Sequence, residues 1–183
     1  MQWTCRCGQV EITADIDGAN DSRLVCYCAS CRRFAVETGA SDTVDAAGGV
    51  DLYQTAVERV AIRRGAERLT WTRYSPKGPV RWFATCCGTS VGNTLPSRQI
   101  PFATLITAGF GDPSALPPVV GRVNRKGATA HIAEDAGNPK KAVRAFIWRA
   151  LKSRLNGGYK RNPFFDAAGN LIADGPNDPP GRV

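Results

Sequence analysis

The stretch CYCASCRR, residues 26–33, places three cysteines within six positions of a chain that holds seven in 183 residues. The other four form a C-x-C motif at Cys5 and Cys7 and an adjacent pair at Cys86 and Cys87. Cysteines this close together make poor disulfides because so small a ring strains the S–S geometry, whereas a metal ion accepts such neighbours. The number of cysteines is also odd, so the pattern favours metal ligation or catalysis over disulfide bonding.

The composition indicates one domain with an extension. A chain of 183 residues with 43% apolar content can bury a core without disulfides. Its start, MQWTCRCGQV, lacks the features of a signal peptide, and its longest apolar run, near 102–110, is too short to span a bilayer. We therefore expect a cytoplasmic protein with reduced thiols and no membrane partner.

Short β-rich runs broken by turn residues fill the chain from Gln2 to about Thr107. Their Val, Ile, Thr, Tyr and Trp content predicts strands. The runs occupy residues 11–16, 23–28, 50–55, 59–65, 68–74, 80–85, 89–95 and 102–107. Strands and helices do not alternate regularly, so the pattern predicts a mainly β protein with antiparallel sheets rather than a parallel doubly wound sheet.

One long helix is predicted over residues 139–155. Asn138 can cap it, a proline suits its first position, and the sequence NGG follows its end. Its apolar residues recur at helical spacing and are expected to pack on the sheet: Val143, Phe146, Ile147, Ala150, Leu151 and Leu155. A shorter helical turn is expected within residues 28–39.

The rest of the predicted organisation follows from these elements. The four tryptophans are expected to fill the core, and the chain from Asp174 onward is expected to form a loosely held tail. We divide the chain into a metal-binding β domain over 1–135 and a basic helix with an extended C-terminal tail, over 136–183, packed on it.

The positive charge of the chain belongs to this C-terminal segment. The formal net charge is +8, and residues 136–165 hold eight basic residues and no acidic one. Removing these eight from the 24 basic residues leaves 16, equal to the 16 acidic residues. The basic helix could therefore contact phosphates of a nucleic acid or another acidic partner. A charge run is more often a solvated face, and the segment carries no nucleic-acid motif.

The seven cysteines divide into four and three. Four thiolates close a tetrahedron around an ion, as in structural sites, whereas three leave a position that can accept another ligand. Cys26, Cys28 and Cys31 are local in sequence, whereas an ion joining the N-terminal pair to Cys86 and Cys87 would connect segments about eighty residues apart. Zn²⁺ is the first choice for thiolate sites in the cytosol, and iron–sulfur clusters remain an alternative.

The order of these motifs resembles the glutathione-dependent formaldehyde-activating enzyme and centromere protein V family. The matching elements read CRCG, CYCASCRR and RWFATCCGTSVGNT, and the resemblance covers about residues 2–110. It implies an antiparallel β-tent fold built around zinc–cysteine sites, here with an accessory C-terminal α-helix. It also implies one structural Zn²⁺ held by the first and last clusters, and one catalytic Zn²⁺ held by Cys26, Cys28 and Cys31, whose open position takes the glutathione thiolate.

The last cluster departs from the family pattern. The family usually has F-C-x-x-C-G-T, and this chain has Ala84 at the first cysteine position, with Cys86 displaced and Cys87 matching the second cysteine. We expect Cys5, Cys7, Cys86 and Cys87 as ligands of the structural ion. The departure places the chain in a divergent subgroup, for which the fold transfers more safely than the activity.

The predicted function is that of a zinc protein that binds a small thiol such as glutathione. The resemblance implies carbon–sulfur lyase activity on S-hydroxymethylglutathione or a related adduct, and whether the chain is an enzyme stays open at this point. Four residues are candidates for binding an anionic thiol: Arg32, Arg33, Asn93 and Thr94. The alternative is that these residues bind no ligand: Arg32 and Arg33 would then form a solvated helix face, and Asn93 and Thr94 would make turn or strand contacts. The alternative function is a structural zinc domain whose basic helix binds nucleic acid or another acidic partner.

Overall fold

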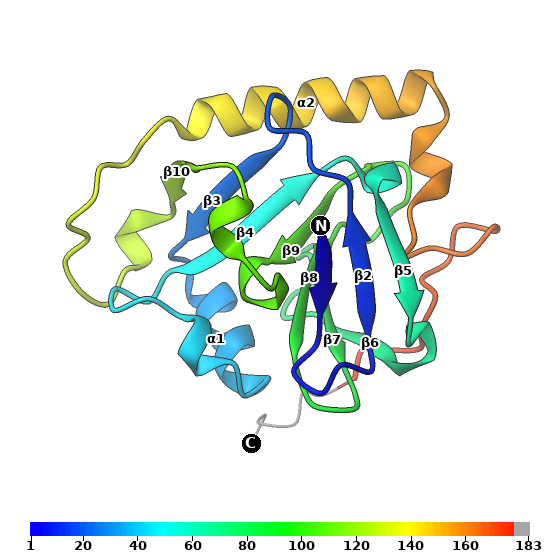
Figure 1. The fold of residues 1–183 in the computed structure, drawn as a ribbon, viewed down its shortest axis with the longest axis horizontal. Coiled ribbons are helices and arrows are strands. Elements are labelled where there is room, and N and C mark those ends of the chain that lie inside the picture. The colour runs from blue at the N-terminus through cyan, green and yellow to red at the C-terminus, as the bar shows by residue number, and fades with distance from the viewer. Residues whose placement is uncertain (178–183) are drawn as a thin grey trace.

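The computed structural model describes residues 1–177, and its core is a pair of β-sheets (Figure 1). The smaller sheet has the strand order β1-β2-β5 and the larger one β10-β3-β4-β9-β8-β7-β6. The small sheet is formed by β1 (Gln2–Thr4), β2 (Glu11–Ala14) and β5 (Val60–Arg64). The large sheet is formed by β3 (Ser22–Cys26), β4 (Val50–Thr55), β6 (Leu69–Thr72), β7 (Val80–Ala84), β8 (Ser90–Thr94), β9 (Ala103–Ile106) and β10 (Val119–Val123).

Two α-helices accompany the sheets, α1 (Ala29–Glu37) and α2 (Pro139–Leu155). The connections contain short 3₁₀ turns at Ser41–Thr43, Val57–Arg59, Ala66–Arg68, Thr107–Gly109, Pro113–Ala115, Arg125–Gly127 and Gly158–Arg161. The predicted mainly β class with a C-terminal helix is thus confirmed, and the helical turn expected within residues 28–39 is α1. In residues 1–177, no helix combines the length and apolar character needed to cross a bilayer.

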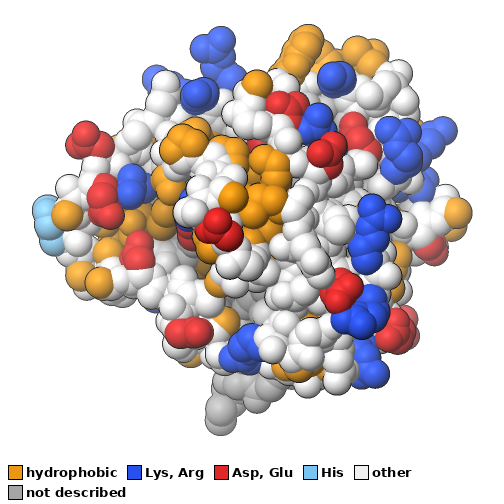
Figure 2. Space-filling view, viewed as in Figure 1, with side chains coloured by type: hydrophobic (Ala, Val, Ile, Leu, Met, Phe, Trp, Pro, Cys, Tyr) orange, Lys and Arg blue, Asp and Glu red, His pale blue; other side chains and the backbone are white. Residues whose placement is uncertain are grey.

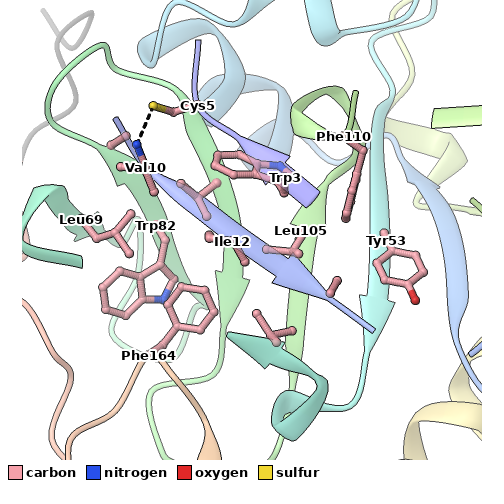
Figure 3. Close-up of a cluster of buried hydrophobic side chains, with 14 of the residues drawn as sticks. Trp3, Cys5, Val10, Ile12, Tyr53, Leu69, Trp82, Leu105, Phe110 and Phe164 are labelled. Carbon is pink, nitrogen blue, oxygen red and sulfur yellow. Dashed lines mark hydrogen bonds between the residues drawn. The ribbon is translucent and has the colours of Figure 1, made fainter. Parts of the chain in front are cut away.

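The large sheet is covered on both faces. One face packs against the small sheet through a core that includes Trp3, Ile12, Trp82 and Leu105 (Figure 3). The other face packs against α1 through a second cluster that includes Phe34. Alternate residues of a strand point to opposite faces, so the strands of this sheet supply apolar side chains to both clusters. Their nearly continuous burial follows from this double coverage.

The pairing departs from the expected antiparallel pattern at one edge. β10 runs parallel to β3, with Arg122 opposite Val25 and Val123 opposite Cys26, whereas the other strand pairs are antiparallel. Parallel neighbours need a long connection rather than a hairpin. β10 comes late in the chain, after the connection that follows β9, and this strand was missed because its sequence VVGRV stands alone among turn residues.

The expected packing of α2 was wrong. Its boundaries match the predicted helix, and the Asn138 side chain caps it by accepting from the Lys141 amide. However, the residues that the helix buries are Ala142, Arg149 and Ser153, whereas its large apolar side chains are mostly exposed. Arg149 donates hydrogen bonds to the Asn20 carbonyl and the Gln54 side chain. The surface beneath α2 carries such hydrogen-bond acceptors, so the helix packs on it with its small and polar residues.

One of the four tryptophans also departs from its expected place. Trp3, Trp71 and Trp82 are buried in the core, as expected, whereas Trp148 on α2 is 58% exposed. It lies on the outer side of the helix because the polar residues described above take the inner side.

The segment after α2 belongs to the main core. Phe164 is buried and its ring lies 4.9 Å from that of Trp82 (Figure 3). Further along, the Trp71 indole donates to the Ala173 carbonyl at 2.9 Å, and the Asn177 amide donates to the Trp71 carbonyl at 2.8 Å. Up to Asn177 the expected tail is therefore tied to β6, and the remainder of the predicted tail, residues 178–183, lies outside the described residues.

The burial of Phe164 predicts that the C-terminal segment stabilises the whole fold. Phe164→Ala should lower the free energy of unfolding by about 3–5 kcal/mol, because it removes a buried ring and leaves a cavity beside Trp82. Leu155→Ala is the matched control, since Leu155 is 80% exposed and its truncation should change stability by less than about 0.5 kcal/mol. Urea unfolding measures both, and equal effects would contradict this packing.

Candidate metal centres

The structure brings the sulfurs of Cys5, Cys7, Cys86 and Cys87, here called the four-cysteine group, within 4.8 Å of one another. The Cys5 sulfur lies 3.6 Å from that of Cys7 and 3.9 Å from that of Cys86. The sulfurs of Cys7 and Cys86 are 3.3 Å apart, and those of Cys86 and Cys87 are 3.8 Å apart. In a tetrahedral site with Zn–S bonds of about 2.3 Å the sulfurs lie about 3.8 Å apart. The group therefore has the spacing of a tetrahedral thiolate site.

Two turns position the four-cysteine group. One follows β1 and the other joins β7 to β8. Cys5 is buried at the rim of the core, where the Val10 amide donates to its sulfur at 3.2 Å (Figure 3). Arg6, between Cys5 and Cys7, donates to the carbonyls of Cys87 and Gly39 at 2.6 Å each. Arg6 thereby ties the first turn to the second and to the end of α1.

Cys86 lies within the four-cysteine group, whereas Ala84 does not. Ala84 is the last residue of β7 and is fully buried in the main core, so its side chain belongs to the sheet. The chain then turns, with the Gly88 amide donating to the Ala84 carbonyl at 2.8 Å, and this turn carries Cys86 toward Cys5 and Cys7. The displaced cysteine thus joins the group despite the altered spacing.

The thiols of the four-cysteine group differ in acidity. Burial, followed by hydrogen bonding with Cys7, raises the pKa of Cys86. Burial opposes ionisation of Cys87 as well, but hydrogen bonds with Thr89 and with Cys7 together outweigh it and lower the pKa of Cys87 to about 6. Four clustered thiolates would repel one another, so full ionisation needs a cation among them. The donor set therefore fits a soft divalent metal.

The sulfurs of Cys26, Cys28 and Cys31, here called the three-cysteine group, form a second cluster within 4.8 Å. Cys26 ends β3, Cys28 is the N-cap residue of α1, and Cys31 lies in its first turn. Cys26 and Cys31 are buried and Cys28 is half-buried. A small ligand that completes this group would therefore approach beside Cys28.

Each sulfur of the three-cysteine group receives one N–H hydrogen bond from the protein. The Asn124 side chain donates to Cys26 at 3.3 Å, and the backbone amide of Cys31 donates to Cys28 at 3.4 Å. The Arg81 guanidinium donates to Cys31 at 3.7 Å. Such contacts stabilise thiolates and orient metal ligands.

The thiols also interact with one another. Hydrogen bonding with Cys26, then with Cys31, lowers the pKa of the Cys28 thiol well below its ordinary value, and the α1 N-terminus acts in the same direction. Hydrogen bonding with Cys26 and Cys28 raises the pKa of Cys31. Without a cation, the group thus favours a single negative charge, held by one thiolate that the other two thiols hydrogen-bond. A divalent ion would allow those two thiols to ionise as well.

Asn124 reaches Cys26 from a special backbone position. It has φ of 57°, in the left-handed region, which asparagine tolerates better than most residues. The turn that follows approaches β3 closely, because a Cβ atom on Gly127 would lie 2.5 Å from the Tyr27 carbonyl oxygen. The backbone thus brings this turn, and with it the Asn124 amide, to the end of β3.

Arg81 is a buried cation beside the three-cysteine group. It is only 3% exposed and donates to the Ser30 hydroxyl at 2.9 Å and the Asn93 side-chain oxygen at 3.1 Å. Its guanidinium also lies 5.6 Å from the ring centre of Phe34. A buried arginine is costly unless its charge is compensated. The sulfur at 3.7 Å supplies that compensation when it is a thiolate.

The four predicted thiol-binding residues have mostly structural contacts. Arg32 donates to the Gly127 carbonyl at 3.0 Å, and Arg33 pairs with Glu37 at 2.7 Å. Asn93 is buried and contacts Arg81, so it bears on the site indirectly. Thr94 is fully buried and accepts from the Trp82 indole at 2.9 Å, within the core. The structure therefore places Asn93 near the site and Thr94 inside the sheet.

Sequence reasoning missed three residues of this site: Ser30, Arg81 and Asn124. Arg81 did leave a signal, because it is a charged residue in VRWFA, a strand otherwise composed of apolar residues. Asn124 left no signal, since its proximity to Cys26 depends on the parallel pairing of β10 with β3.

Comparisons with known proteins give a family but no activity. A family described as being of unknown function, DUF6151, matches residues 1–173. No curated protein matches the chain. A crystal structure of a Rhodobacter sphaeroides protein from a structural-genomics programme matches with 24% sequence identity and a TM-score of 0.45, covering 65% of this chain and 97% of that one.

The two cysteine groups predict two separable metal sites. Cys28→Ser should remove about one metal equivalent per chain and leave the fold intact, because the four-cysteine group keeps its ligands. Cys5→Ser should remove the other equivalent and lower the melting temperature by on the order of 10 °C, since the ion connects distant segments of the core.

Elemental analysis and thermal unfolding of protein purified without added metal test these expectations. Wild-type protein without bound metal would contradict both sites. A Cys28→Ser variant that keeps two equivalents would contradict the three-cysteine site alone.

Proposed function

This chain belongs to the DUF6151 family, whose function is unknown, and we propose that it is a zinc protein that binds a small thiol at the three-cysteine group. The four-cysteine group is its structural site. The observation that carries the proposal is the set of three clustered sulfurs, each with its own N–H donor. Three ligands leave a fourth tetrahedral position for an incoming thiol.

The two cysteine groups differ in what surrounds them. The four-cysteine group has a full ligand set and joins segments about eighty residues apart, which suits a role in folding. The three-cysteine group has an incomplete ligand set, a half-buried member and a buried cation. A zinc ion bound there would supply a docking point for a thiolate and lower the pKa of the arriving thiol.

The residues of the chain would prepare this site for an anionic ligand. Arg81 offsets the negative charge that three thiolates place around the ion, and the α1 N-terminus and Asn124 hold two of the sulfurs in position. Because the charge is offset inside the protein, a fourth sulfur meets less repulsion. The Ser30 hydroxyl, 3.4 Å from the Cys28 sulfur, adds a polar group on the accessible side.

We further propose that the chemistry follows the family that the motifs resemble, a carbon–sulfur lyase acting on S-hydroxymethylglutathione or a related adduct. In the forming direction the thiol sulfur attacks the aldehyde carbon and a C–S bond forms. The carbonyl π electrons move to oxygen, which gains the proton lost by the thiol. The cleavage direction reverses these changes, so the reaction needs no oxidant or reductant.

Thiol binding can be tested with cobalt in place of zinc, because the absorption of Co²⁺ reports its ligands. Glutathione should change the cobalt–thiolate spectrum of the wild type, and of Cys5→Ser if that variant folds. It should leave Cys28→Ser unchanged. S-methylglutathione, which has no thiol, is the control ligand. A spectrum that glutathione does not alter would instead make the three-cysteine group a purely structural site.

Arg81 should support metal binding more than its exposed neighbour Arg33. Arg81→Gln should weaken zinc binding by the three-cysteine group about 10–100-fold, because a contact to a ligand and a compensating charge are both lost. Arg33→Gln should leave the affinity unchanged, since Arg33 pairs with Glu37. Competition with a chromophoric chelator measures both affinities, and Arg81→Lys should recover part of the loss. Equal affinities in all three variants would contradict this role.

A further inference from the structure

Helix α2 presents apolar and basic side chains together on its outer side. Five large apolar residues of this helix are half or more exposed: Val143, Ile147, Trp148, Leu151 and Leu155. Exposed cations of the same helix lie among and beside them, at Lys140, Lys141, Arg144 and Lys152. α2 forms the upper edge of the molecule in Figure 1, and Figure 2 shows blue and orange side chains along that edge. We call these nine residues the outer α2 face.

Among residues 1–177, no acidic residue forms an ion pair with this face. Residues 136–165 contain no acidic residue. Asp17, Asp21 and Glu58 share a hollow with Trp148 and Lys152. Asp17 pairs with Arg59, Asp21 accepts from Tyr53, and Glu58 accepts from Ser153 on the inner side of the helix. The positive charge of Lys140, Lys141 and Arg144, which line a groove without acidic residues, is thus available to a partner.

A groove of about 890 Å³ runs between α2 and the loop at Ala19 and Asn20. It is lined by Lys140, Lys141 and Arg144 toward the start of the helix and by Ile147, Trp148 and Leu151 further along. One end is therefore cationic and the other apolar. This arrangement matches an amphiphile that has an anionic head and a hydrocarbon tail.

We propose that the outer α2 face docks on the surface of an anionic phospholipid bilayer. A helix with large apolar residues beside lysine and arginine lies in the interface, with its apolar side chains in the acyl boundary and its cations at the headgroups. An exposed tryptophan favours the same depth. The expectation of no membrane partner concerned a segment that spans the bilayer, whereas this peripheral contact needs none. It departs from that expectation, and it is independent of the proposed thiol chemistry.

Other occupants fit this face less well. A second copy of the chain would bring two cationic faces together, which repel. A nucleic acid would use the cations but leave Ile147, Leu151 and Leu155 without a role. An acidic protein would need a groove complementary to a helix that stands out at the edge of the molecule, whereas a lipid surface adapts to it.

Tryptophan fluorescence with lipid vesicles tests the proposal, because Trp148 is exposed and the other three tryptophans are buried. Vesicles of phosphatidylcholine with 30% phosphatidylglycerol should shift the emission to the blue. Binding should be at least about tenfold tighter than to pure phosphatidylcholine, and it should weaken as salt rises. Trp148→Phe should abolish the shift while sedimentation still reports binding.

Leu151→Glu should weaken vesicle binding at least about tenfold, because it places a carboxylate at the centre of the face. Val36→Glu is the matched control, since Val36 is equally exposed but lies on α1. It should bind like the wild type, and the melting temperatures of both variants should be unchanged. Lys140→Glu combined with Arg144→Glu should remove the preference for anionic vesicles.

Three results would overturn the proposal. The first is equal binding of the wild type and Leu151→Glu to anionic vesicles. The second is a blue shift that grows with protein concentration without lipid, together with a dimer in sedimentation, because a second copy would then cover the face. The third is binding to duplex DNA or to an acidic peptide in the absence of vesicle binding.

Discussion

The convergence of sulfur atoms from distant parts of the chain is the constraint on which this structure depends. Cys5 and Cys7 follow the first strand, Cys86 and Cys87 follow the seventh, and their sulfurs meet at 3.3–3.9 Å. Thiols placed so closely gain little from one another unless a cation allows them to ionise. A metal ion at this point would link the small sheet to the large one. Binding of such an ion would therefore fix the position of the two sheets relative to each other.

In the three-cysteine group, the repulsion among clustered thiolates is reduced by other groups of the protein. The group has fewer sulfurs, and the protein compensates them with groups from three separate elements: the α1 N-terminus, Arg81 of β7 and Asn124 after β10. Burying an arginine beside thiolates is favourable only while the sulfurs are ionised. The fixed positive charge of Arg81 thus favours the ionised state of the neighbouring sulfurs, which is the arrangement expected of a site that holds a metal and admits an anion.

The features that could be predicted from the sequence are those that depend on residues close together in the chain. The strands from β2 to β9 and the ends of α2 follow from composition and caps, and the two cysteine groups follow from spacing. Sequence reasoning could not predict contacts set by topology. Asn124 reaches Cys26 only because β10 pairs in parallel with β3, and Arg81 faces Cys31 only because β7 exposes that side to α1. Arg32 and Arg33, which were chosen because they follow the motif, contact Gly127 and Glu37, and their role in thiol binding stays a prediction.

The packing of α2 is a second feature that the local sequence pattern could not predict. Periodicity identified its apolar side correctly, but the surface beneath the helix decided which side is buried. On that surface the Asn20 carbonyl and the Gln54 side chain accept hydrogen bonds from Arg149. The Glu58 side chain accepts one from Ser153. Large apolar residues left in solvent beside unpaired cations cost solubility unless they meet a partner. The helix boundaries are thus a property of the segment, whereas its orientation is a property of the fold around it.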